Sequence, residues 1–330
     1  MGEKLGDHMR VARAIAVLSF TLILGLAVPA RGDDSRPTIG ATKTAVLVWL
    51  ADELGYIEDA GFQAKMFQSG TITSKALAEG DIQMATSSHV AFIARALKVP
   101  GLETVSTLST SRTARLLGRK DLTDATAQAL VGKSVGVTAG SFGEYMLSRF
   151  LLMNGVSMHD LQLRNMRPTE IVRELSEGEL AAAITWEPYV YQARQALGDL
   201  TLDFPGQENL YYYFVLVARS EWLDSNEKRV ADLLSALVRA ETFAREDPAR
   251  SKSLIARRYE VSDDFIDYLW PEHSLTVALP QDLVRLMEEA VLWRREIEKS
   301  NEALPMPNVL DYVRSAPLRS AAPEAVGLIE

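Results

Sequence analysis

Residues 63–97 read QAKMFQSGTITSKALAEGDIQMATSSHVAFIARAL, a stretch in which short apolar runs alternate with longer amphipathic ones. Together with the preceding residues, it predicts strands at Thr38–Gly40, Gln63–Phe67 and Ile82–Ala85, and helices at Ala45–Ala60, Thr73–Glu79 and Val90–Leu97. Strands that alternate with helices are typical of an α/β protein with largely parallel sheets.

The same β-α-β-α order returns from about Leu130, without the sequence of the first block. We expect strands at Ser134–Thr138, Leu161–Asn165, Ala181–Thr185 and Tyr211–Ala218, and helices at Gly143–Met153 and Pro168–Ser176. Two such blocks in 330 residues predict two α/β lobes.

After Trp222, the sequence pattern predicts helices almost throughout. The expected helices are Asn226–Arg245, Ala249–Arg258, Asp263–Trp270 and Gln281–Ser300, with prolines between them. Because this block cannot form a third sheet, we expect it to pack onto the first lobe.

The N-terminus has the layout of a secretory signal peptide. Arg10 and Arg13 precede an apolar run of about 15 residues, Ala14–Val28, and Ala30 follows at an acceptable cleavage position. We predict that residues 1–30 are removed and that the mature protein is periplasmic. A retained anchor is the alternative, but the run is shorter than the roughly 20 residues that span a bilayer. We expect either Met1 or Met9 to be the first residue of the translated chain.

The chain contains no cysteine, which excludes a lipid-anchored cysteine, disulfides, thiolate metal sites and a cysteine nucleophile. The formal charge is −9, and residues 1–30 carry three cations and two anions, so the mature chain would carry −10. An acidic balance argues against nucleic acid or anionic lipid as a partner.

Small polar clusters stand where the expected strands end. They are Ala41–Thr44, Gln68–Thr71, Thr86–His89, Thr107–Thr110 and Thr138–Gly143. In an open parallel sheet, ligands bind beyond the carboxyl ends of the strands, where helix N-termini present free N–H groups. The alternative is that these residues serve only as helix caps, for which Ser, Thr and Gly are common.

Several short motifs occur in a characteristic order and spacing. They are Leu54-Gly55-Tyr56, Gln68-Ser69-Gly70, Leu77–Ile82, Ala85–Ser88, Leu130–Val137, Gly178–Ala183 running into Trp186-Glu187-Pro188, and Phe243–Ala249. In this order and spacing they resemble the periplasmic solute-binding proteins of the sulfonate, taurine and nitrate type. The resemblance covers nearly all of the mature chain. It implies a type II periplasmic-binding-protein fold: two α/β lobes, each a mostly parallel sheet flanked by helices, with the C-terminal helical block on lobe 1.

The resemblance also implies two chain crossings and ligand contacts from the loops after the strands. We place the crossings near Leu116–Arg119 and Val215–Arg219, so that lobe 1 comprises residues 37–117 and 218–330 and lobe 2 comprises residues 118–217. The expected ligand-binding residues are Lys43, Thr44, Ser69, Gly70, Ser87, Ser88, Ser141, Phe142, Trp186 and Glu187.

Two aromatic segments leave alternatives open. Trp186 could stack on a ligand, with Glu187 at the cleft mouth, or it could pack in the core beside a solvated Glu187. If Glu187 faces the ligand it favours an amine, whereas Lys43 favours an anion. The run Tyr211–Phe214 should alternate sides as a strand, and packing is the preferred interpretation over binding.

No residue pattern predicts catalysis, a metal or a cofactor. His89, His159 and His273 lack metal-ligand spacing, and the acidic pairs Asp263-Asp264 and Glu288-Glu289 fall in helical, solvated contexts. We therefore expect a monomeric, non-enzymatic solute-binding component that delivers a small polar or anionic molecule to an inner-membrane ABC permease. The alternatives are an enzyme of the same fold in cofactor-precursor metabolism and a ligand-binding partner of a sensor.

Overall fold

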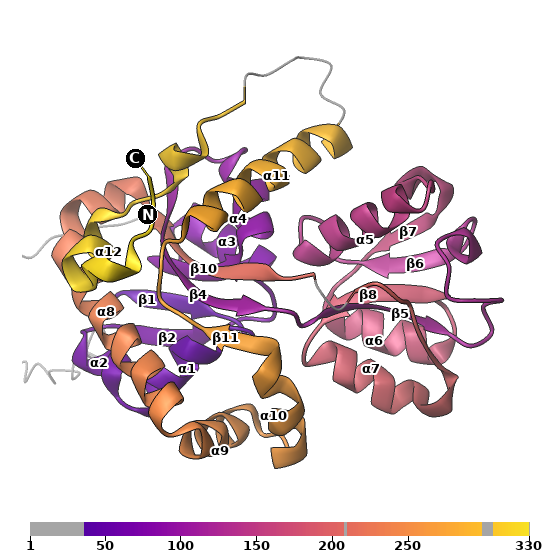
Figure 1. The fold of residues 1–330 in the computed structure, drawn as a ribbon, viewed down its shortest axis with the longest axis horizontal. Helices are drawn as coiled ribbons and strands as arrows, with labels where there is room; N and C mark the ends of the chain where they lie inside the picture. Colours follow the sequence, from indigo (N-terminus) through magenta and orange to yellow (C-terminus); the bar gives the residue numbers. More distant parts are fainter. Residues whose placement is uncertain (1–35, 208–209, 299–305, 330) are drawn as a thin grey trace, which may run out of the picture. The chain divides into compact units, whose positions relative to one another are not determined.

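The computed structural model describes residues 36–207, 210–298 and 306–329, which form two β-sheets flanked by helices (Figure 1). The first sheet has the order β11-β4-β10-β3-β1-β2, with β1 (Thr38–Ala41), β2 (Gln63–Met66), β3 (Met84–Ser88), β4 (Leu102–Ser111), β10 (Tyr212–Arg219) and β11 (His273–Leu275). The second has the order β7-β6-β8-β5-β9, with β5 (Ala114–Arg119), β6 (Ser134–Val137), β7 (Gln162–Asn165), β8 (Ala182–Trp186) and β9 (Thr201–Asp203). We call the two halves lobe 1 and lobe 2.

Both sheets are mixed, where the sequence predicts mostly parallel ones. In lobe 1, β1 runs parallel to β2 and β3, but β10 is antiparallel to β3 and β4. In lobe 2, β6 runs parallel to β7 and β8, but β5 is antiparallel to β8 and β9. The antiparallel strands β4, β5 and β10 adjoin the passages between the lobes, so they lack the helical crossover that makes neighbouring strands parallel.

The expected helices are present, with bounds that differ by a few residues, and two helices that the sequence pattern did not predict, α7 and α12, accompany them. The helices are α1 (Val46–Glu53), α2 (Tyr56–Asp59), α3 (Gly70–Glu79), α4 (His89–Ala96), α5 (Phe142–Met153), α6 (Pro168–Glu177), α7 (Tyr189–Leu197), α8 (Ser220–Glu246), α9 (Pro248–Tyr259), α10 (Asp263–Leu269), α11 (Gln281–Glu298) and α12 (Ala316–Ala321). The single helix predicted over Ala45–Ala60 is divided in two, because Gly55 takes the left-handed conformation with φ = 79° between α1 and α2.

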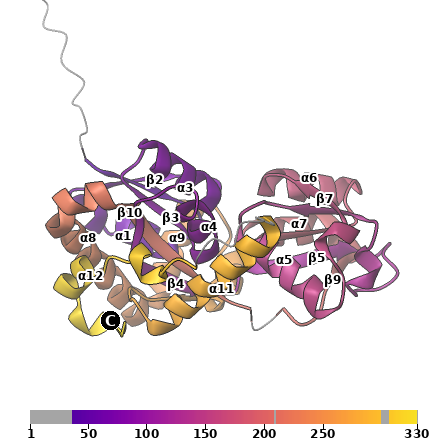
Figure 2. The same ribbon diagram turned by 90° about the horizontal axis from the view of Figure 1, so that it is seen from above.

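The C-terminal helical block packs on lobe 1, as predicted. Helices α8 and α9 contact α1, α12 contacts α8, and α11 contacts α4 on the other side of the sheet (Figures 1 and 2). The apolar stripe of α8, which includes Val230, Leu233, Leu234 and Leu237, is fully buried. Two helices of this block also contact lobe 2: α10 beside α7, where Tyr191 packs on Phe265, and α11 beside α5, where Tyr145 packs on Trp293.

The cluster Thr107–Thr110, expected at a strand end, lies inside β4. This strand is buried although it is rich in Ser and Thr, because most of its buried hydroxyl groups have hydrogen-bond partners, while that of Ser106 has none among the described residues. The Thr107 hydroxyl donates to the carbonyls of Thr276 and Ala278, each at 3.0 Å, and the Thr104 hydroxyl donates to that of Leu216 at 3.1 Å. Satisfied hydroxyl groups let polar residues occupy a buried strand.

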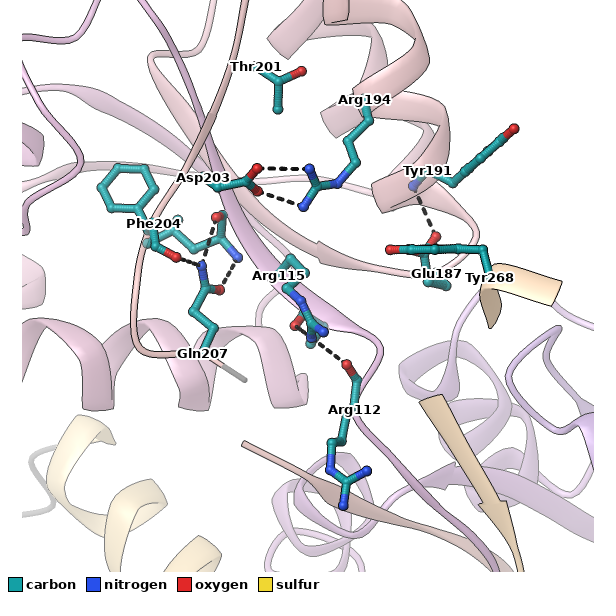
Figure 3. A network of polar contacts seen from close by, with 12 residues as sticks. Arg112, Arg115, Glu187, Tyr191, Arg194, Thr201, Asp203, Phe204, Gln207 and Tyr268 are labelled. Atoms are coloured by element: carbon teal, nitrogen blue, oxygen red, sulfur yellow. Dashed lines mark hydrogen bonds and ion pairs between the residues drawn. The ribbon is translucent and has the colours of Figure 1, made fainter. Parts of the chain in front are cut away.

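The chain passes to lobe 2 between Ser111 and Ala114, and it returns between Asp203 and Tyr212. Both passages come earlier in the chain than Leu116–Arg119 and Val215–Arg219, which lie within β5 and β10. The predicted lobe boundaries at 117/118 and 217/218 therefore fall inside strands. Gln207 anchors the returning segment: its side-chain amide donates to the Leu116 and Phe204 carbonyls and accepts from the Leu116 N–H (Figure 3).

The predicted signal peptide, residues 1–30, lies outside the described residues. Among the helices of the described part of the chain, no segment has the length and apolar character needed to span a membrane.

Candidate functional site

Three helix N-termini begin at the strand ends that the sequence singles out. Each is capped by a serine whose hydroxyl accepts a hydrogen bond from a backbone N–H of its own helix. Ser69 caps α3 through Ile72, Ser88 caps α4 through Ala91, and Ser141 caps α5 through Glu144. Such ends carry partial positive charge and N–H groups without an intrahelical acceptor, which favours negatively charged or hydrogen-bond-accepting ligand atoms.

These N-termini surround a cavity of about 30 Å³ between the lobes. Lobe 1 contributes Thr42, Thr44, Gly70, Thr71, Ser88 and Ala91, and its strand β10 contributes Tyr212 and Phe214. Lobe 2 contributes Ala114, Ser141, Phe142 and Trp186. A second cavity of about 150 Å³ shares Thr42, Thr44 and Trp186 with the first. We call the two together the cleft. The inner cavity is only two to three times the roughly 10–15 Å³ that one water needs, so the lobes approach closely around it.

The structure gathers most of the predicted ligand-binding residues at the cleft. Thr44, Gly70, Ser88, Ser141, Phe142 and Trp186 line the inner cavity, and Lys43 and Glu187 line the outer one. Ser69 and Ser87 line neither. Ser69 acts as the α3 cap, and the fully buried Ser87 donates its hydroxyl hydrogen to the Ser88 carbonyl at 3.0 Å.

Gly70 permits the close approach of α3 to β3. A Cβ atom at this position would lie 2.9 Å from the Ser87 Cβ and 3.0 Å from the Ser87 Cα. The absence of a side chain therefore sets how near the N-terminus of α3 comes to the end of β3.

The two charged residues predicted at the cleft are engaged by the C-terminal helical block. Lys43 donates from Nζ to the carbonyl of Tyr259, the last residue of α9, at 3.2 Å, and Nζ lies 5.6 Å from the centre of the Tyr259 ring. The partial negative charge of a helix C-terminus stabilises this ammonium group. Lys43 therefore places its charge toward α9, at the edge of the outer cavity.

Glu187 is buried, with 4% of its surface exposed, which differs from the alternative of a solvated side chain. Its carboxylate accepts hydrogen bonds from the Tyr191 N–H at 2.9 Å and from the Tyr268 hydroxyl at 2.8 Å (Figure 3). Burial raises its pKa from the ordinary 4.5 to about 6, and the two hydrogen bonds oppose this shift. Tyr268 belongs to α10, so Glu187 joins the lobes.

Trp186 is partly exposed and lines both cavities, so it forms the cleft wall. Its ring meets that of Tyr189 edge to face, with centroids 6.4 Å apart. A wall of this kind offers an apolar surface to the body of a ligand.

The expected ligand-binding residues did not include six that line the inner cavity. Thr42 and Thr71 belong to the predicted polar clusters, whereas no site role was predicted for Ala91, Ala114, Tyr212 and Phe214. The Thr42 hydroxyl is buried and has no hydrogen-bond partner among the described residues. Tyr212 and Phe214 are alternate members of the aromatic run, and the burial pattern of β10 confirms the predicted alternation. Tyr212 also packs, since its ring lies 4.5 Å from that of Phe142 and its hydroxyl bonds with Thr113 at 2.7 Å. The alternation of side chains along a strand was the sequence signal that could have identified Tyr212 and Phe214 as residues of one face.

The structure thus defines a class: a two-lobed α/β protein of the periplasmic-binding-protein fold, with polar helix N-termini facing an interlobe cleft. The family model described as NMT1/THI5 like matches residues 44–251, and the chain belongs to this family. A relative from Brucella abortus (strain 2308) that carries the name of a binding protein is 23% identical over 218 residues, 64% of this chain and 67% of its own.

Solved structures share the fold. The alkanesulfonate-binding protein SsuA from Xanthomonas axonopodis pv. citri, bound to MOPS, is 18% identical and superposes with a TM-score of 0.73 over 85% of this chain and 98% of its own. The periplasmic aliphatic sulphonate-binding protein SsuA from Escherichia coli is 17% identical, with a TM-score of 0.68 over 84% and 96%. The desulfurization enzyme DszB is also 17% identical, with a TM-score of 0.63 over 87% and 99%. Fold and family support a solute-binding role.

Proposed function

We propose that the protein is the extracytoplasmic solute-binding component of an ABC importer. It captures a small polar or anionic molecule, such as a sulfonate, taurine or nitrate, in the cleft and delivers it to an inner-membrane permease. The observation that carries this proposal is the meeting of three capped helix N-termini, those of α3, α4 and α5, at one cavity between two lobes.

The cleft would bind its ligand mainly through neutral donors. Backbone N–H groups of the three helices and the hydroxyls of Thr42, Thr44 and Thr71 face the polar part of the ligand, and Trp186 borders the remainder. Because the inner cavity holds about 30 Å³, a ligand larger than a few atoms requires the lobes to separate and close again. The two chain passages next to β5 and β10 are the positions for such a hinge.

We propose that this protein has no catalytic activity, although DszB shares the fold. The carboxylate of Glu187, which borders the cleft, is occupied by Tyr191 and Tyr268, and the chain has no cysteine. We also propose that residues 1–30 are a signal peptide, so the exported protein should begin at Arg31, which mass spectrometry of the periplasmic fraction checks.

Calorimetric titration of the purified mature protein with alkanesulfonates, taurine and nitrate tests the binding role. We expect saturable 1:1 binding of at least one compound, together with a change in tryptophan fluorescence that Trp186→Phe abolishes or strongly reduces. Size-exclusion chromatography should give a monomer. If none of the compounds binds and Trp186→Phe leaves the emission unchanged under all conditions, the cleft is not a site for this class of ligand.

A further inference from the structure

A separate chamber of about 450 Å³ shares only Phe142 with the cleft. Its walls come from α4, α5 and α11, from β5 and β8, and from residues 205–207 and 210–211. This volume lies within the range of roughly 300–1,000 Å³ that is typical of small-molecule sites, whereas the inner cavity of the cleft does not.

One stripe of α5 forms the main wall of the chamber. Its members recur at helical spacing and are Phe142, Tyr145, Met146, Arg149, Phe150 and Met153. Residues at intervals of three and four lie on one face of a helix, so this face is apolar and aromatic except for Arg149. Leu116, Ile184 and Leu286 extend the apolar lining on β5, β8 and α11. Such a lining favours a ligand with an apolar or aromatic body.

Most polar side chains of the chamber are already paired with other protein groups. The Tyr145 hydroxyl donates to Glu289 at 3.3 Å, and the Tyr211 hydroxyl donates to Asp282 at 2.7 Å. Arg285 pairs with the same two carboxylates, at 2.8 Å to Asp282 and 2.5 Å to Glu289.

Two further polar side chains are also committed to backbone groups. The Gln207 amide bonds with Leu116 and Phe204, and Asn154 donates to the Phe150 carbonyl at 2.8 Å. His89 is buried and its Nδ1 has no hydrogen-bond partner among the described residues, but the ring is neutral at physiological pH, since burial lowers its pKa to about 4. Arg149 is exposed and forms no hydrogen bond or ion pair with the described residues. Arg149 is therefore the charged side chain of this lining that is available to pair with an anionic group of a ligand.

We propose that this chamber is a second small-molecule site, distinct from the cleft, which takes an amphipathic anion. The apolar or aromatic body of the ligand packs against the α5 stripe and Leu286, and a single carboxylate or sulfonate pairs with Arg149. An exposed guanidinium is suited to this role, because it can bind either anion through two parallel hydrogen bonds. The proposal does not depend on the cleft being the cargo site.

Fluorescence titration with 8-anilinonaphthalene-1-sulfonate, an aromatic body with one sulfonate, tests the chamber. The folded full-length mature protein should bind one equivalent with enhanced emission. Arg149→Glu should weaken binding about fivefold or more, since an attractive pair becomes a repulsive one. Leu286→Trp, which places a larger ring in the chamber, should weaken it as well. Arg257→Glu is the matched control on α9, and it should leave the affinity unchanged.

The cleft variant Gly70→Ala separates the two sites. It should leave binding of the fluorescent probe intact while weakening the calorimetric binding of a sulfonate cargo. Probe binding that survives both Arg149→Glu and Leu286→Trp, or that is lost in Gly70→Ala, overturns the chamber proposal and leaves the cleft proposal standing. Circular dichroism and urea denaturation check that each variant is folded. Arg149→Glu should fold normally, because the side chain it replaces is exposed.

Discussion

The carboxylate of Glu187, which follows the last residue of β8 in lobe 2, accepts a hydrogen bond of 2.8 Å from the hydroxyl of Tyr268 on α10. The two residues are 81 positions apart, and the bond joins lobe 2 to the C-terminal helical block. Arg115 of β5 and Glu272 form an ion pair of 3.2 Å that joins the same parts of the chain. The lobes are therefore linked beside the cleft by polar contacts as well as by the two passages of the backbone.

Glu187 should make the stability of the protein depend on pH. Its pKa is about 6 in the folded state and 4.5 when unperturbed, so the folded protein holds more protons than the unfolded chain between these values. The free energy of unfolding should therefore fall as the pH rises through this window. Above pH 6 the free energy of unfolding is lowered by the full cost of burying the ionised carboxylate, about 2 kcal/mol.

Glu187→Gln keeps an acceptor for Tyr268 and removes the titration. The variant should gain stability relative to the natural protein as the pH rises from 4.5 to 7, by up to about 2 kcal/mol. Urea denaturation of both proteins across this range gives the difference directly. A difference that stays constant with pH would show that Glu187 does not titrate in this window.

Tyr268→Phe removes the hydroxyl that bonds to Glu187. A hydrogen bond to a charged acceptor contributes about 1.5–3 kcal/mol, so we expect a loss of that order in unfolding free energy at pH 7.5. The loss should be smaller at pH 5, where Glu187 is protonated in the folded state. Tyr211→Phe is the matched control, because its hydroxyl also bonds to a carboxylate, that of Asp282, in a more solvated position. An equal loss in both variants would argue against a special role for the buried pair.

Gly70→Ala tests the close approach of α3 to β3. The added Cβ would lie 2.9 Å from the Ser87 Cβ, so the N-terminus of α3 must shift. We expect a loss of about 1–3 kcal/mol in stability and weaker binding at the cleft. Gly327→Ala is the control, since its Cβ would meet nothing closer than 3.8 Å and should leave both quantities nearly unchanged. Urea denaturation and calorimetry read the two effects separately.

Ser141→Ala separates the capping role of this residue from its place at the cleft. Loss of the cap of α5 should lower stability by about 1 kcal/mol and should also weaken ligand binding, because Ser141 lines the inner cavity. Ser262→Ala removes an equivalent cap from α10, through the N–H of Phe265, and should cost a similar amount of stability without reducing cleft affinity. If both variants bind equally well, Ser141 acts only as a cap.

The sequence predicted the alternation of strands and helices because periodicity is a local property. The spacing of apolar residues located β1, β2 and β3 and the helices between them to within a few residues. It did not locate β4, because a strand of Ser and Thr looks like a loop until its hydroxyls find partners. Those partners, such as the carbonyls of Thr276 and Ala278, come from residues about 170 positions later in the chain.

By itself, the sequence determined the α/β class, the two blocks, the helical C-terminal block and the serines that cap three helix N-termini, since each depends on neighbours within a few residues. Only the tertiary structure decided which of the predicted residues face the cleft. Ser87 is buried and bonded to the Ser88 carbonyl, Lys43 is held by the end of α9, and Glu187 is buried and bonded to Tyr268. The physical reason is that burial, charge pairing and cavity shape depend on segments that are distant in sequence. A local sequence pattern does not indicate which distant segment will pack against a given residue.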